Sequence, residues 1–191
     1  MSRNYLPSRQ AGKFHNPEGL YFVSFAVVDW IDALTRIEYK QIIIESLSFC
    51  QKEKGMQIIA WCIMSNHMHL VFRSIADNKP QDILGDFKRF TSKAIVKAIK
   101  DNPRESRREF LLQAFQYAAS KSSNVLHFQF WRHDNKPIEL WSNKVIKEKI
   151  NYVHQNPVEE GIVFKAEDYR FSSAVDYAGE KGLIKDILVV K

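Results

Sequence analysis

The chain has 191 residues, 45% of them hydrophobic, which is enough for one domain with a buried core and excludes disorder throughout. Lys and Arg number 28 against 22 Asp and Glu, and the net charge of +6 suits a polyanionic partner such as a nucleic acid. The two cysteines lie in apolar segments without CxxC spacing, and the chain has neither a secretory signal nor about 18 consecutive apolar residues, so we expect a cytoplasmic protein without disulfides, thiolate zinc sites or membrane spans.

The first half of the chain predicts a helix between strands. Residues 1–18 are polar and form a predicted N-terminal arm. The segment Leu20–Val28 is rich in β-branched and aromatic residues, which predicts a strand, and apolar residues at helical spacing predict a helix over Glu38–Glu53. The apolar run Met56–Met64 and the segment His67–Ser74 are separated by only a Ser and an Asn, which predicts a β-hairpin.

The second half is more helical. Apolar residues on one side predict a long helix over Gln81–Lys100, and a short helix is expected over Glu109–Ala119, followed by the polar loop KSSN. The segment Phe128–Arg132 is typical of a strand. A last helix is predicted over Asn143–Asn156, and Pro157 should end it.

This order of elements predicts an α+β fold. We expect a ferredoxin-like antiparallel sheet with helices packed on one face, plus a helical insertion. The expected domain organisation is an N-terminal arm of residues 1–18, a domain of residues 19–178 with the insertion at about 101–127, and a C-terminal tail of residues 179–191.

The segment SNHMHLVF carries the strongest motif of the hairpin. Residues two apart on a strand point to the same face, so His67 and His69 should project together. Two adjacent imidazoles can hold a transition metal and leave coordination positions open, as a catalytic site requires. A pair of histidines at this spacing also arises by chance on a half-exposed strand face.

The segment KEKINYVHQNPV supplies a candidate nucleophile. Its apolar stripe leaves Tyr152 off centre, on a face shared with Lys149 and Asn156. A phenol can carry a phosphoryl group covalently and then leave, so that a cut strand can be rejoined. Tyr152 could equally be a core residue at the rim whose hydroxyl meets water.

A basic stretch follows the hairpin. Residues 79–108 hold nine Lys and Arg against four acids and thus carry +5 of the net charge. Such a line of cations can follow a phosphate backbone, although it can also be an ordinary solvated helix face. The candidate DNA-binding residues are Lys88, Arg89, Lys93, Lys97 and Lys100.

Four motifs in this order resemble a known family. The hairpin WCIMSNHMHLVF, the segment FKRFTSK, the segment INYVHQNPVEEGIV and the closing EDYRFSS are similar to those of the REP-associated tyrosine transposases, which belong to the single-tyrosine HUH transposases of bacterial insertion sequences. The resemblance covers roughly residues 18–178.

The resemblance implies a ferredoxin-like sheet and single-stranded or hairpin DNA as the partner. It implies that His67 and His69 bind Mg²⁺ or Mn²⁺ and that Tyr152 attacks a DNA phosphate, which leaves a 5′-phosphotyrosine and a free 3′-hydroxyl. The family often has a polar third ligand one turn after the tyrosine. Asn156 stands there, with His154 and Gln155 as alternatives.

Two other functions fit the same residues. The chain could be a domesticated DNA-binding protein that keeps the fold without turnover, or a metal phosphodiesterase that uses water as its nucleophile. Only the transposase would form a covalent adduct between protein and DNA. Both a monomer and a homodimer are compatible with the sequence.

Overall fold

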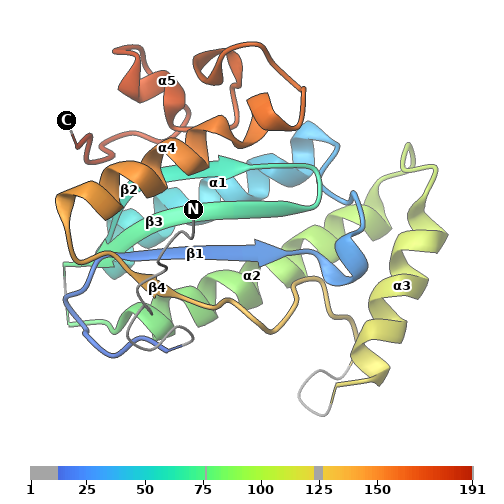
Figure 1. Ribbon diagram of the computed structural model, residues 1–191. Helices are drawn as coiled ribbons and strands as arrows, with labels where there is room; N and C mark the ends of the chain where they lie inside the picture. Colours follow the sequence, from blue (N-terminus) through green and yellow to red (C-terminus); the bar gives the residue numbers. More distant parts are fainter. Residues whose placement is uncertain (1–12, 76, 123–126, 191) are drawn as a thin grey trace, which may run out of the picture.

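The computed structural model describes residues 13–75, 77–122 and 127–190, and most of the predicted arm therefore lies outside the described residues. The sheet consists of strands β1 (Tyr21–Ala26), β2 (Met56–Ile63), β3 (His67–Ser74) and β4 (Ile138–Glu139). The strand order is β2-β3-β1-β4, and every neighbouring pair is antiparallel (Figure 1). This order confirms the prediction of an α+β, ferredoxin-like fold.

The long helices agree with the predicted segments to within three residues. The first of these helices ends at Gly55, whose φ of 69° lies in the left-handed region that glycine adopts without strain. The helices and short helical turns are α1 (Ile37–Lys54), α2 (Pro80–Asp101), α3 (Arg108–Ser120), α4 (Asn143–Glu159), α5 (Ala174–Tyr177), η1 (Val28–Trp30) and η2 (Ala166–Asp168). None of the described helices is long and apolar enough to cross a membrane.

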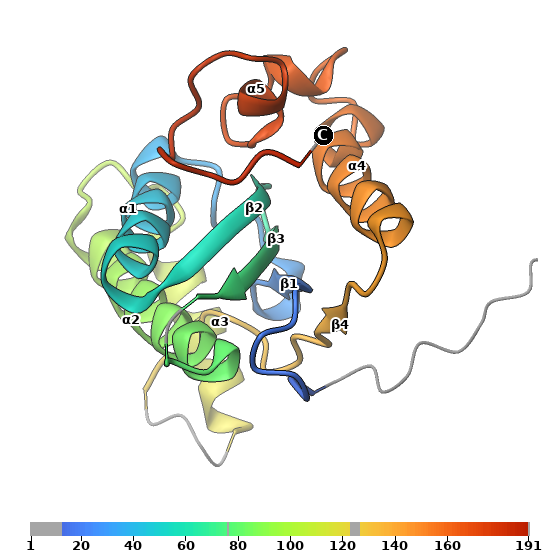
Figure 2. The same ribbon diagram turned by 90° about the vertical axis from the view of Figure 1, so that its left-hand side faces the viewer.

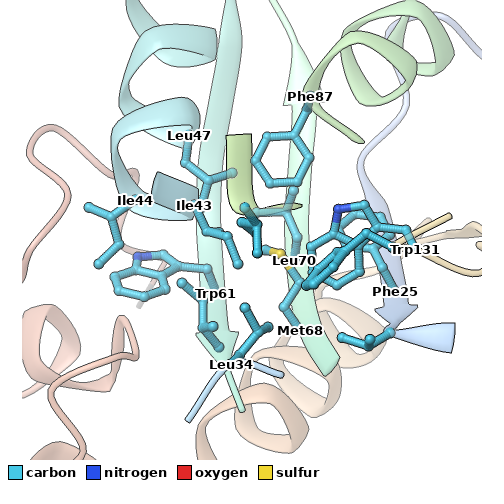
Figure 3. Close-up of a cluster of buried hydrophobic side chains, with 14 of the residues drawn as sticks. Phe25, Leu34, Ile43, Ile44, Leu47, Trp61, Met68, Leu70, Phe87 and Trp131 are labelled. Carbon is cyan, nitrogen blue, oxygen red and sulfur yellow. The ribbon is translucent and has the colours of Figure 1, made fainter. Parts of the chain in front are cut away.

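Helices cover both faces of the sheet, which corrects the prediction of helices on one face only (Figure 2). On one face, α1 and α2 enclose the large core around Phe25, Trp61 and Phe87 (Figure 3). On the other face, α4 buries Ile150 and Val153 against the hairpin. The reason is that β2 carries apolar side chains on both faces, so neither of its faces can be left to water.

Two local predictions were wrong. The segment Phe128–Arg132 is not a strand, because Phe130 and Trp131 are both buried and the segment makes only an isolated bridge with Val27 beyond the end of β1. The fourth strand is instead the two-residue β4. Likewise, α4 does not stop at Pro157 but continues to Glu159, because a proline in the last turn removes only one helical hydrogen bond.

The segment predicted as an insertion contributes α3 to the domain. Leu111 and Phe115 on α3 are fully buried and belong to the large core. Figure 1 shows α3 beside the segment that follows β1, which brings α3 close to one end of the sheet. Residues 123–126, which include part of the predicted polar loop, lie outside the described residues.

Candidate active site

His67 and His69 lie at the start of β3, on the face that α4 covers. They pair with Ala26 and Ser24 of β1, and their ring centroids are 4.8 Å apart. The intervening Met68 points into the large core on the opposite face. Both imidazoles are more than nine-tenths buried, because α4 packs across β2 and β3 (Figure 2). The alternation along the strand thus places two buried imidazoles side by side.

Helix α4 brings two further candidate residues to the histidines. The Tyr152 ring centroid lies 5.2 Å from that of His69, and Asn156 Oδ1 lies 3.2 Å from His67 Nε2. Tyr152 is 39% exposed, so its side chain is packed on one side and open to solvent on the other. A residue from a rigid helix therefore stands at a partly open edge of the histidine pair.

An aromatic ring and a cation complete this edge. Phe22 of β1 stacks on His69 at 5.6 Å and contacts Tyr152 edge-on at 5.8 Å. The ammonium of Lys149 lies 4.9 Å from the Phe22 ring and 5.1 Å from the Tyr152 ring. Positive charge beside the phenol favours the approach of an anionic group such as a phosphate.

Burial favours the neutral form of both histidines. Burial lowers the pKa of His67, and burial together with the neighbouring His67 lowers the pKa of His69 to about 3. Both ring nitrogens of His69 are buried without a hydrogen-bond partner in the described part of the chain. A buried polar atom without a partner is costly, and neutral imidazoles offer lone pairs, so the pair is suited to binding a cation.

Asn66, in the turn before β3, determines which nitrogen of His67 carries a proton. Its amide donates to the carbonyl oxygen of Trp30 at 3.2 Å, so its Oδ1 faces His67 Nδ1 at 2.7 Å. Nδ1 must then be the donor, which leaves a lone pair on Nε2, and this lone pair faces Oδ1 of Asn156. Two acceptors that face one another are stabilised by a cation between them.

The alternatives to Asn156 as the third ligand differ in their contacts. His154 points away from the histidine pair: its Nε2 lies 2.8 Å from Ser173 Oγ and its ring packs on Tyr177. Gln155 is partly buried. Among the described residues no group of three or more His, Cys, Asp and Glu could hold a metal. A site at His67 and His69 therefore needs an oxygen ligand of another kind, which the Asn156 amide can supply.

The basic helix lies across the sheet from the histidines. Arg89, Lys93, Lys97 and Lys100 are exposed along α2, which packs on the opposite face from α4. They line a groove of about 900 Å³ between α2 and residues 127–135. Lys100 lies 4.0 Å above the Phe128 ring in this groove. The groove combines cations with an aromatic ring, as single-stranded nucleic-acid grooves do.

Lys88 differs from the rest of this set. Its ammonium is directed inward, where it donates to the carbonyl oxygen of Arg132 at 2.7 Å and to the side chain of Asn135. Burial lowers its pKa to about 8. The geometry therefore assigns Lys88 to holding residues 132–135 against α2 rather than to a phosphate.

Two residues near the histidines were missed by sequence reasoning. The sequence predicts only a turn role for Asn66, although its place directly before a histidine is a signal for a residue that orients the imidazole. Trp30 lies 5.8 Å from the His67 ring, and no sequence pattern connects these two residues. Their proximity depends on the pairing of β1 with β3.

Comparison with protein families and solved structures gives several matches. A family model described as transposase IS200 like matches residues 31–133, which include both histidines and the basic helix and end before Tyr152. The structure of a REP-associated tyrosine transposase bound to a REP hairpin is similar with a TM-score of 0.63 and 16% sequence identity, over 96% of this chain and 94% of that chain. At this identity the likeness concerns the fold.

Two tRNA(His) guanylyltransferase structures are more distant. The enzyme from Saccharomyces cerevisiae gives a TM-score of 0.45 at 12% identity over 76% of this chain and 61% of that chain. A bacterial tRNA(His) guanylyltransferase-like protein in complex with GTP gives 0.42 at 9% identity over 75% and 66%. Both scores are too low to bear on function. No sequence among curated proteins matches the chain.

Proposed function

The chain belongs to the family of IS200-like transposases, and from this premise we propose that it cuts and rejoins single-stranded DNA through a covalent bond between Tyr152 and a 5′ phosphate. Family membership implies a DNA-processing enzyme. The covalent mechanism, the residues and the metal are our proposal.

The observation that carries the proposal is the meeting of Tyr152 with His69 at 5.2 Å between ring centroids. The two residues are 83 positions apart in the sequence and lie on different elements, a helix and a strand. One side of Tyr152 is exposed, so a phosphate can reach its hydroxyl from solvent. A nucleophile on a rigid helix beside candidate metal ligands is the arrangement that in-line phosphoryl transfer needs.

We propose that His67, His69 and Asn156 hold one Mg²⁺ or Mn²⁺. The two nitrogens of His69, which have no hydrogen-bond partner among the described residues, and the facing acceptors of His67 and Asn156 support this donor set. Asn66 supports it further, because it fixes the His67 tautomer from outside the site. When bound, the metal supplies Lewis-acid stabilisation of the negative charge on the scissile phosphate.

The Tyr152 oxygen attacks phosphorus in our proposal. The bond between this oxygen and phosphorus forms, the bond from phosphorus to the 3′ oxygen breaks, and the phenolic proton passes to water. The 3′ oxygen takes a proton from water and leaves as a hydroxyl. Lys149 favours the step by placing positive charge near the incoming phosphate. Attack of a 3′-hydroxyl on the phosphotyrosine reverses these bond changes and rejoins a strand.

Single-stranded DNA, with or without a hairpin, is the proposed substrate. The similar solved structure is bound to a REP hairpin, which supports a hairpin as one form of the substrate. The cations of α2 support binding to a phosphate backbone, and we propose that Arg89, Lys93, Lys97 and Lys100 contact it.

The test is a search for the covalent adduct. Wild-type protein is incubated with Mn²⁺ and 5′- or 3′-labelled single-stranded oligonucleotides that carry candidate hairpins, and products are separated under denaturing conditions. We expect a protein-linked fragment and a free 3′-hydroxyl fragment. Tyr152→Phe should form neither product while it binds the oligonucleotide as the wild type does.

A matched control is Tyr177→Phe, because Tyr177 also lies on a helix, α5, but its hydroxyl donates to the carbonyl oxygen of Ile59. This variant should cut normally. An adduct that persists in Tyr152→Phe would show that another tyrosine is the nucleophile. Cutting by Tyr152→Phe without any adduct would identify water as the nucleophile and favour a metal phosphodiesterase. Binding without cutting by the wild type would favour a domesticated DNA-binding protein.

A further inference from the structure

An exposed tryptophan stands beside the histidine pair in an uncommon backbone conformation. Trp30 ends the short turn η1, and its indole is 53% exposed. Asp29 and Trp30 have φ values of 52° and 56°, in the left-handed region that residues with a Cβ rarely adopt. Such conformations persist where the surrounding structure determines them, and they gather at functional sites.

The surroundings of Trp30 fix it to the candidate metal site. The amide of Asn66 donates to the Trp30 carbonyl oxygen and meets His67 Nδ1 with its own oxygen, so one side chain links both residues. The edge of the turn is also tied to residues 130–132, since Val28 N donates to Phe130 O at 2.9 Å and Arg132 N to Ala26 O at 2.9 Å. The backbone of Trp30 is therefore held in place while its indole stays exposed.

The charges around Trp30 indicate which kind of partner it meets. The Arg132 guanidinium lies 5.7 Å from the Trp30 ring centroid. A hollow of about 340 Å³ adjoins η1, and its lining includes Tyr117, Lys121 and Arg132. Lys121 lies 3.9 Å above the Tyr117 ring. Cations beside flat rings suit a phosphate beside a base better than they suit an apolar protein surface.

The position of Trp30 connects two parts of the proposed DNA path. Arg132 lines both the groove beside α2 and the hollow beside η1. The Trp30 ring contacts both Arg132 and His67: the Arg132 guanidinium lies over it, and the His67 ring meets its edge at 5.8 Å between centroids. A strand that ran from the groove at Arg132 to His67 would therefore meet the exposed indole.

We propose that Trp30 stacks on an unpaired base next to the scissile phosphate, while Arg132 contacts a phosphate of the same strand. The inference rests on the proposed function and adds a positioning residue to it. Stacking on Trp30 would hold one nucleotide in a fixed place, so that the adjacent phosphate reaches Tyr152 in line. Any base can stack, so Trp30 would contribute affinity and position rather than sequence preference.

The test uses tryptophan fluorescence in EDTA, so that neither metal nor cleavage is needed. A mixed-sequence single-stranded 20-mer is titrated into wild type, Trp30→Phe and the matched control Trp141→Phe, in which the removed indole is 75% exposed and precedes α4. Trp61 and Trp131 are buried and should change little. We expect saturable quenching in the wild type and in Trp141→Phe, and loss of most of it in Trp30→Phe.

Affinity provides a second measurement. Trp30→Ala should weaken binding of the 20-mer about tenfold, and Trp30→Phe should bind within about threefold of wild type because phenylalanine also stacks. Quenching that survives in Trp30→Phe, or unchanged affinity in Trp30→Ala, would overturn the inference. A shift of Trp30→Ala to a smaller oligomer with unchanged DNA affinity would also overturn it, because the indole would then contact a second copy.

The outcome is separable from that of the proposed function. Tyr152→Phe should show the same quenching as wild type, since stacking precedes any bond to Tyr152. If no covalent adduct forms but quenching still depends on Trp30, the protein has a single-strand binding site and lacks the proposed covalent chemistry. If the adduct forms normally but quenching does not depend on Trp30, the covalent chemistry of Tyr152 is supported and the stacking role of Trp30 is refuted.

Discussion

Removal of two cations from α2 should change the salt dependence of DNA binding by a calculable amount. Arg89, Lys93, Lys97 and Lys100 are exposed on one line of the helix, and each can neutralise one phosphate. Single-stranded binding then has a slope of about −2.8 in a plot of log affinity against log salt, because each neutralised phosphate contributes about −0.7. The double variant Lys93→Ala, Lys97→Ala should have a slope of about −1.4.

These slopes correspond to a large difference between the two proteins. Between 50 and 200 mM salt, the wild type should lose about 50-fold in affinity and the double variant about sevenfold. Fluorescence anisotropy of a labelled 20-mer in EDTA measures both slopes without cleavage. Lys93 has no ion-pair partner among the described residues, whereas Lys97 pairs with Asp101, so Lys93→Ala alone should account for at least half of the change.

A matched control removes the same charge elsewhere. Lys52→Ala, Lys181→Ala has the same net charge as the test variant, and both residues are exposed and lie away from the groove beside α2. Its slope should remain near that of the wild type. If the test variant keeps the wild-type slope, or if the control loses as much as the test variant, the DNA does not follow α2 and the reasoning from the groove is refuted.

Three further predictions concern the site and its support. His69→Ala should abolish cleavage and leave single-strand affinity within about twofold, because the imidazole is buried away from the basic groove; gel assays and anisotropy of the same variant check this. Asn66→Ala should weaken Mn²⁺ binding about tenfold in titrations followed by electron paramagnetic resonance, because His67 loses the partner that fixes its tautomer; unchanged affinity would contradict the role of Asn66. The pKa of Lys88 is lowered from 10.5 to about 8, so the unfolded chain binds this proton more tightly and the free energy of unfolding should rise by about 2 kcal/mol between pH 7 and 9.5. Urea unfolding of Lys88→Met should lack this gain, and an equal gain in the variant would show that other groups cause it.

Much of the site follows from local patterns in the sequence. The alternation of β3 predicts that His67 and His69 share a face, because that property depends only on the two-residue period of a strand. The apolar stripe of the last helix likewise predicts that Tyr152 lies at the edge of the buried face. The two-residue turn predicts the hairpin that carries the histidines. Each of these properties is determined by neighbours within a few residues.

Only the tertiary structure decides which surfaces meet. Strand β2 carries apolar residues on both faces, so its sequence does not say which face α4 covers, and the packing of Val153 and Ile150 on one of them is what brings Tyr152 to His69. The same choice places the basic α2 on the opposite face. The approach of Trp30 to His67 depends on strand pairing between segments about 40 residues apart. Such contacts arise from packing between distant elements, for which the local pattern carries no signal.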